Sequence, residues 1–225
     1  MKAIHMPPMD RLVLITLLAL LTATAGCNNL VRGHGIRRYE IKQFDEADVR
    51  LSHMLTKNPT DWQALYYQGK VRLEQDRPLE AELMLEQALS IRHDYPETPQ
   101  IIDALAEAMY RQGRTVTLYA LLEDATINYG TSHDYIRQGN YTALSNDPDA
   151  AEVAFTKAAI FADPDDPKPY LAAADFYESI NNIPKAKIAL RRAYGLTPSD
   201  PVVINRLQQH GIVPGPTAIL PVVHR

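Results

Sequence analysis

The chain has 225 residues, of which 46% are hydrophobic and 22% are charged, and its formal net charge is −4. This balance is typical of a soluble body large enough to bury a core, and the lack of a basic excess argues against nucleic-acid binding. The single cysteine, Cys27, excludes a disulfide within the chain and a multi-cysteine metal site.

Residues 1–26 have the order of a bacterial secretory signal peptide. Lys2 and Arg11 make the start basic, residues 12–21 (LVLITLLALL) are almost wholly apolar, and residues 22–26 are small and uncharged. The apolar run is shorter than the stretch of about 20 residues that a transmembrane helix needs. We therefore expect a signal segment rather than a membrane-spanning helix.

The end of this segment, Thr24-Ala25-Gly26-Cys27, resembles the cleavage box of bacterial lipoproteins. The resemblance implies cleavage before Cys27 and attachment of acyl chains such as palmitate to it, which would hold the protein at a membrane. Asn28 follows the cysteine, and by the rule of that family this favours the outer membrane, facing the periplasm. Two alternatives remain open: an ordinary signal cleaved near Gly26, or an uncleaved anchor.

A tether is expected next, over residues 27–43. Its first part contains Gly33-His34-Gly35 and little periodic apolar pattern, which is typical of a linker. Residues 44–57 then match the second helix of a helix pair and are the first part of the expected helical domain.

The helical domain, residues 44–210, is organised by a repeat of about 34 residues. Small residues recur at repeat positions 8, 20 and 27, and a large apolar residue recurs at position 24. Closely packed helices need this combination, since a small side chain at the contact leaves a hole for the large one. The windows are 62–95, 99–132, 132–165 and 167–200; position 8 is Gly69, Ala106, Gly139 and Ala174, and position 24 is Leu85, Leu122, Phe155 and Leu190.

These positions resemble the tetratricopeptide repeat (TPR), which implies an all-α fold: a TPR-like right-handed solenoid of antiparallel helix pairs. Leu118 stands at position 20, where the family has a small residue, so residues 99–132 are expected to be the least regular pair. The first helix of residues 132–165 is polar and is expected to be short or frayed.

Two segments follow the last full repeat. Residues 201–210 are predicted to form a helix that covers the final pair, as solenoids require, with Gly211 as its C-cap. Residues 211–225 contain three prolines, all within an apolar run that carries no charge before His224 and Arg225. They are expected to form an extended or disordered tail, with docking left open.

The sequence contains no signature of catalysis. It lacks an HExxH zinc motif, a glycine-rich phosphate loop and a GxSxG elbow. The acidic clusters around Asp147 and Asp163 are interpreted as turns and N-caps. We therefore predict no enzyme activity, no cofactor, no metal and no small-molecule substrate.

The resemblance to TPR proteins places a partner-binding groove on the concave face, lined by first helices. The residues at groove positions are a mixture of aromatic, apolar and charged types, which suits a peptide or a partner helix. The predicted set is Tyr66, Lys70, Glu107, Tyr110, Arg111, Asn140, Leu171 and Asp175.

The leading hypothesis for function is a lipid-anchored adaptor or scaffold that binds another protein in the bacterial cell envelope. Two alternatives belong to other classes. One is an accessory factor for assembly of a pilus or secretin, or for polysaccharide export. The other is a passive structural component of an envelope complex.

Overall fold

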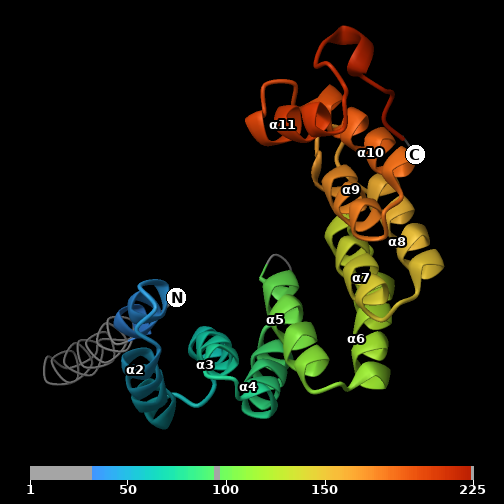
Figure 1. The fold of residues 1–225 in the computed structure, drawn as a ribbon. Coiled ribbons are helices and arrows are strands. Elements are labelled where there is room, and N and C mark those ends of the chain that lie inside the picture. The colour runs from blue at the N-terminus through green and yellow to red at the C-terminus, as the bar shows by residue number, and fades with distance from the viewer. Residues whose placement is uncertain (1–31, 94–96, 224–225) are drawn as a thin grey trace, which may run out of the picture. The chain divides into compact units, whose positions relative to one another are not determined.

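The structure is a computed structural model that describes residues 32–93 and 97–223. Within these ranges the secondary structure is helical, with no strand. The chain divides into two compact units, Met1–Gly113 and Arg114–Arg225, and each is considered by itself (Figure 1). The boundary falls inside the repeat window 99–132, between its two helices.

The first unit consists of successive helices that pack on their neighbours. Residues 32–40 are helical, and α2 packs on α3, α3 on α4 and α4 on α5. A further contact joins α3 to α5, which are the first helices of successive repeats. The helices are α2 (Phe44–Lys57), α3 (Trp62–Glu74), α4 (Pro78–Ile91) and α5 (Thr98–Arg111).

The second unit repeats this arrangement. The helix pairs α7–α8 and α9–α10 are each packed closely, and α7 also contacts α9 (Figure 1). The helix α11 lies on α10 and buries Val203 and Leu207 there. The elements are α6 (Thr115–Asn128), α7 (Ser132–Leu144), α8 (Pro148–Ile160), α9 (Lys168–Ser179), α10 (Ile183–Leu196), α11 (Pro201–Gln209) and the short 3₁₀ helix η1 (Pro216–Ala218).

The helix pairs are held together by the small and large residues that the repeat predicts. A Cβ atom placed on Gly69 would lie 2.6 Å from Cγ of Leu85, and one on Gly139 would lie 2.7 Å from Cε1 of Phe155. These distances are too short for real contacts, so the helices approach as closely as they do because a side chain is missing. The large residues at position 24 are all at most 2% exposed: Leu85, Leu122, Phe155 and Leu190.

The turn between the two helices of a repeat has a constant backbone conformation. The residue at repeat position 15 has a positive φ in each case, and glycine, asparagine and aspartate reach this region most easily. In the clearest examples the next N–H donates back to a carbonyl five residues earlier, as from Arg77 to Arg72 and from Asn182 to Tyr177, which satisfies a carbonyl at the helix end. The residues with positive φ at this position are Lys42, Asp76, Gly113, Asn146 and Asn181.

The expected tether is wrong for residues 32–40, which form a helix. Gly35 occupies position 8 of an additional repeat, and a Cβ there would meet Cδ2 of Leu51 at 2.9 Å. Arg32 extends from this helix to Asp61, with 3.0 Å between its guanidinium nitrogen and the carboxylate. The half-repeat predicted at α2 is therefore a complete pair. The proposed signal peptide and Cys27 lie outside the described residues.

The first helix of residues 132–165 is neither short nor frayed, contrary to expectation. It has 13 residues, as α3 and α8 do. Thr131 and Asp134 form a reciprocal capping box at its start, and Asp134 also accepts a hydrogen bond from Arg137 at 2.9 Å. Polar residues of this helix are thus used in capping and in a buried ion pair.

The tail over residues 212–223 is ordered and packed, which corrects the expectation of an extended or disordered segment. Gly211, with φ of 73°, ends α11 as predicted, and the chain then returns to α10. Ala218 is only 3% exposed, within the hydrophobic core of α9, α10 and α11. The tail is thus part of the second unit.

The close contact at Gly69 predicts a difference between two glycine substitutions. Gly69→Ala should lower the free energy of unfolding by about 1–3 kcal/mol, because its methyl group collides with buried Leu85 and overpacks the pair. Gly33→Ala should raise it by about 0.5–1 kcal/mol, because that helical glycine has open space around its Cβ position. Urea denaturation of both variants measures this; equal effects would contradict the contact.

Candidate functional site: a tyrosine-lined groove in the first unit

A groove of about 440 Å³ lies on the first helices of the first unit. Its walls come from the helix of residues 32–40, from α3 and from α5. We call it the tyrosine groove and define it by its lining residues: Tyr39, Tyr66, Lys70, Leu73, Glu74, Gln100, Asp103, Ala104, Glu107 and Arg111.

The groove exists because of the way the helix pairs pack. The small residues Gly35 and Gly69 bring the helix of residues 32–40 close to α2 and bring α3 close to α4, and both glycines are buried on that side. The contact between α3 and α5 then places successive first helices side by side. The remaining face of these helices carries the lining residues, so residues at repeat positions 5, 9 and 12 converge there.

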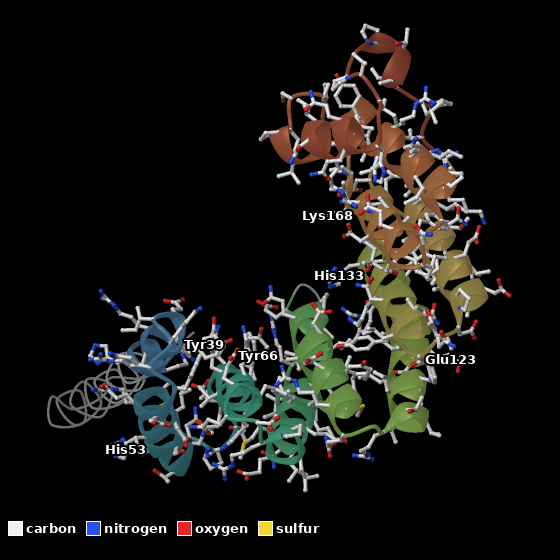
Figure 2. All side chains as sticks on the ribbon, in the orientation of Figure 1. Tyr39, His53, Tyr66, Glu123, His133 and Lys168 are labelled. Atoms are coloured by element: carbon white, nitrogen blue, oxygen red, sulfur yellow. The ribbon has the colours of Figure 1, made fainter. Side chains whose placement is uncertain are left out.

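One side of the groove is an aromatic cluster that surrounds the ammonium group of Lys70. Its Nζ lies 4.7 Å from the ring centroid of Tyr39, 5.3 Å from that of Tyr66 and 5.7 Å from that of Tyr67. The rings also contact one another, with centroids 5.6 Å apart for Tyr39 and Tyr67. Cation–π attraction of this kind holds a cation without a direct ion pair. Figure 2 labels Tyr39 and Tyr66 on their two elements.

Burial in this cluster shifts the ionisation of its members. It raises the pKa of Tyr66 to about 12, with further contributions from Tyr67, Tyr39 and Asp103, because a second negative charge there is unfavourable. The pKa of Lys70 is lowered by the same burial, and the nearby charge of Glu74 offsets this in part. Near neutral pH the tyrosines are therefore neutral hydroxyl groups that both donate and accept hydrogen bonds.

The other side of the groove holds a fixed ion pair. Nε of Arg111 lies 2.7 Å from Oε1 of Glu107, one helical turn away on α5. The same guanidinium donates a hydrogen bond of 2.8 Å to the backbone carbonyl of Leu73 at the end of α3. Arg111 thus links the two first helices, and its charge is compensated within the groove.

The structure brings together four of the predicted site residues: Tyr66, Lys70, Glu107 and Arg111. Tyr110 lies next to them in sequence but does not line the groove, and it is 39% exposed on α5. Sequence reasoning missed Tyr39, which was assigned to the tether, and Asp103. Tyr39 stands at repeat position 12 and Asp103 at repeat position 5, and both are groove positions. The repeat register could therefore have predicted both residues.

The other three predicted residues belong to the second unit. Asn140 is exposed on α7, and Leu171 is half-buried against the core of α9, α10 and α11. Asp175 is exposed and pairs with Arg206 of α11 at 2.7 Å. Arg206 also pairs with Glu178, so in this unit a predicted groove residue is held by a charge network.

That network continues to His210. Its Nε2 lies 2.7 Å from Oε1 of Glu178, and Arg206 donates to the other oxygen of the same carboxylate. Burial raises the pKa of Glu178, but the hydrogen bonds from His210 and Arg206, together with the electrostatic attraction of the same two groups, outweigh the burial and hold the pKa below its ordinary value. The carboxylate therefore remains charged and fixes α11 to α9.

Neither a metal-binding cluster nor a membrane-spanning helix is found among the described residues. No three His, Cys, Asp or Glu side chains among them converge in a way that could hold a metal ion. Among the helices described, none is long and apolar enough to cross a bilayer. The surface features found in these ranges are grooves and ion pairs.

The fold matches solved TPR structures. A thermophilic TPR protein of Thermus thermophilus superposes with a TM-score of 0.59 at 20% identity, over 81% of this chain and 98% of that one. PilF of Pseudomonas aeruginosa gives a TM-score of 0.59 at 16% identity, over 83% and 87%. YrrB, described as a TPR protein with an unusual peptide-binding site, gives 0.50 at 18% identity, over 79% and 90%.

These likenesses define the class of fold: it is the all-α, TPR-like arrangement of antiparallel helix pairs that the repeat predicts. Comparison of the sequence with protein-family models and with characterised protein sequences gives no match. At these identities the solved structures bear on the fold and not on the partner.

The ionisation of Tyr66 predicts how stability changes at alkaline pH. Its pKa in the folded chain, about 12, exceeds the ordinary value of 10.0, so the folded state holds the proton more tightly. The free energy of unfolding should therefore fall by about 1–3 kcal/mol more in the natural chain than in Tyr66→Phe as the pH rises from 10 to 12. Urea denaturation across this range tests it, and parallel curves for the two proteins would contradict the assignment.

Proposed function

We propose that the protein is an interaction adaptor of the bacterial cell envelope that binds an extended peptide or a helix of a partner protein in the tyrosine groove. The observation that carries this proposal is the groove itself, where Tyr39, Tyr66 and Lys70 face the Arg111–Glu107 pair across successive first helices. The peptide-binding site named for the structurally similar YrrB supports the same kind of role.

The chemistry of the groove suits a protein ligand. Tyrosine side chains supply large apolar surfaces and hydroxyl groups at a low cost in conformational entropy, and interfaces concentrate their binding energy in such residues and in arginine. The charges of Glu107 and Arg111 compensate each other. We therefore expect recognition by shape and hydrogen bonding, with a small dependence on ionic strength.

Attachment to the membrane completes the proposal. The sequence order of residues 1–27 supports cleavage before Cys27 and acylation of that cysteine, with the outer membrane facing the periplasm as the location. A lipid anchor would concentrate the groove at one surface, which is what an adaptor for an envelope complex requires. An accessory role in the assembly of a pilus or secretin, or in polysaccharide export, is the alternative to this adaptor role.

The groove can be tested by site-specific cross-linking in intact cells. A photo-activatable residue at Gln100, exposed on the groove side of α5, should capture one discrete partner, whereas the same residue at Glu86, exposed on α4, should not. Adding Tyr66→Ala should weaken this capture at least severalfold, because removal of an aromatic anchor costs more than about 1 kcal/mol of binding. Melting followed by circular dichroism must show that the variant remains folded. Equal capture at both positions would contradict the proposal.

Acylation is tested separately. Labelled palmitate should be incorporated into the natural protein and not into Cys27→Ser, because the thiol is the only cysteine of the chain. The variant should also move from the membrane fraction to the soluble fraction, since stable anchoring requires the acyl chains. Equal labelling of both proteins would rule out Cys27 as the site.

A further inference from the structure

The C-terminal strap, residues 212–223, lies on the second unit in the manner of a bound peptide. After α11 it passes along α10, forms the 3₁₀ turn η1, and reaches α9, where Val223 meets Tyr170. Figure 1 shows this segment, in the deepest red, beside α10. The strap thus contacts helices that precede it in the chain by more than twenty residues.

The surface beneath the strap binds mainly its backbone carbonyls. Arg191 donates from Nε to the carbonyl of Ala218 at 2.8 Å and from a second nitrogen to that of Thr217 at 2.9 Å. Arg192 donates to the carbonyl of Pro221 at 3.1 Å. Proline keeps its carbonyl and lacks only the N–H, so a surface that binds carbonyls accepts proline-containing segments without leaving a donor unpaired.

At the end of the strap, the backbone N–H of Val223 donates to the hydroxyl of Tyr170 at 2.9 Å. The strap also approaches α10 closely at Gly195, where an added Cβ would lie 3.0 Å from Cγ2 of Ile219. A glycine inside a helix is unfavourable by itself. Here it provides the room that a segment lying on the helix requires.

The core beneath the strap is formed mainly by side chains of α9, α10 and α11. Leu190, Ala193, Val203 and Leu207 are each 0% exposed, and they belong to α10 and α11. In contrast, the strap contributes one fully buried side chain, that of Ala218, while Val213 is 83% and Ile219 44% exposed. The strap is therefore held by hydrogen bonds, by the buried methyl group of Ala218 and by partial burial of Ile212 and Val222 against this core.

The surface extends past the residues that the strap contacts. Two hollows, of about 280 and 440 Å³, share Tyr170 and Val223 in their linings. The first continues between α8, α9 and α10 to Phe155 and Tyr177. A ligand that extends into this hollow would reach the partly exposed ring of Tyr177, whereas Phe155 is only 2% exposed.

We propose that this surface, which we call the strap site, binds an extended, apolar, proline-containing segment of a partner protein, and that the strap occupies the site in cis. This goes beyond the tyrosine groove, because it concerns a different surface in the other unit. The strap shows the chemistry that the site accepts. The strap of a second copy would make only the same contacts as the chain's own strap. It would also lack the high effective concentration that tethering gives to the chain's own strap. A longer segment of a partner protein is therefore the ligand that can displace the strap.

The test measures binding of a fluorescent peptide of residues 212–223 to the full chain by anisotropy. Ala218→Glu in the chain should free the strap, because a carboxylate is not accommodated at that buried position. The opened chain should bind the peptide about tenfold or more tightly than the natural chain, in which the tethered strap competes. A peptide carrying the same Ala218→Glu change is the matched control and should not bind.

Variants of the site itself complete the test. In the opened chain, Arg191→Ala with Arg192→Ala should weaken peptide binding about tenfold or more, because they donate three of the hydrogen bonds to the strap. Lys187→Ala removes another cation of α10 and should change binding less than about twofold, since its ammonium has no described contact with the strap.

If Ala218→Glu does not fold by circular dichroism, Val222→Asp serves as the opening variant, because Val222 is only half-buried. The proposal would be overturned if a folded opening variant bound the natural and the control peptide with equal affinity, or bound neither of them. So would a natural chain that light scattering shows to be a dimer and that Ala218→Glu converts to a monomer, because the occupant in trans would then be a second copy.

Discussion

The close contact between the two helices of a repeat, in the pairs that lie within one unit, is the constraint on which the rest of the structure depends. At Gly35, Gly69 and Gly139 the facing residue occupies the volume that a Cβ atom would fill. This approach leaves one face of each first helix directed away from its partner helix. Because α3 also contacts α5, those free faces adjoin one another and form the tyrosine groove. The absence of a Cβ atom at these glycines thus also determines where the opposite faces of the first helices, which carry the groove residues, are placed.

The turn at repeat position 15 acts together with this contact. A positive φ there reverses the chain and satisfies carbonyls at the helix end, so that the second helix begins within a few residues. Asp76, Asn146 and Asn181 are residue types that adopt this conformation at small cost, and Lys42 adopts it although it is a less favoured type. The turn and the small residues therefore specify the same register, and agreement between independent local preferences is what makes a sequence fold to one structure.

The sequence predicted the helix pairs α3–α4, α7–α8 and α9–α10 and the buried positions within them, since both depend on residues spaced along a single helix pair. It failed where a long-range contact decides the structure. Residues 32–40 contain two glycines and no clear apolar period, and their helix depends on the contact of Gly35 with Leu51 and on the ion pair of Arg32 with Asp61. The strap is held by Arg191 and Arg192 across 26 to 29 residues of sequence, which no local pattern indicates. The polar helix α7 shows the same limit, because its stability comes from a capping box and a buried ion pair.

The residues that specify the fold and those that face the grooves are separate sets, and this explains why the fold was predictable while the partner was not. Positions 8, 20, 24 and 27 repeat with nearly the same residue types, because each pair solves the same packing problem. The groove positions differ: position 5 is Tyr66 in one repeat and Asp103 in the next, and position 9 changes from Lys70 to Glu107. The packing of the two helices of a pair does not fix these residues, so the repeat pattern does not indicate what they bind. The two cations of the lining, Lys70 and Arg111, are offset by the carboxylates of Glu74, Asp103 and Glu107, which leaves little net charge from which a partner could be inferred. In the proposed function, the ligand is recognised by the shape of the aromatic surface and by hydrogen bonds, which are properties of the assembled helices and not of any one repeat.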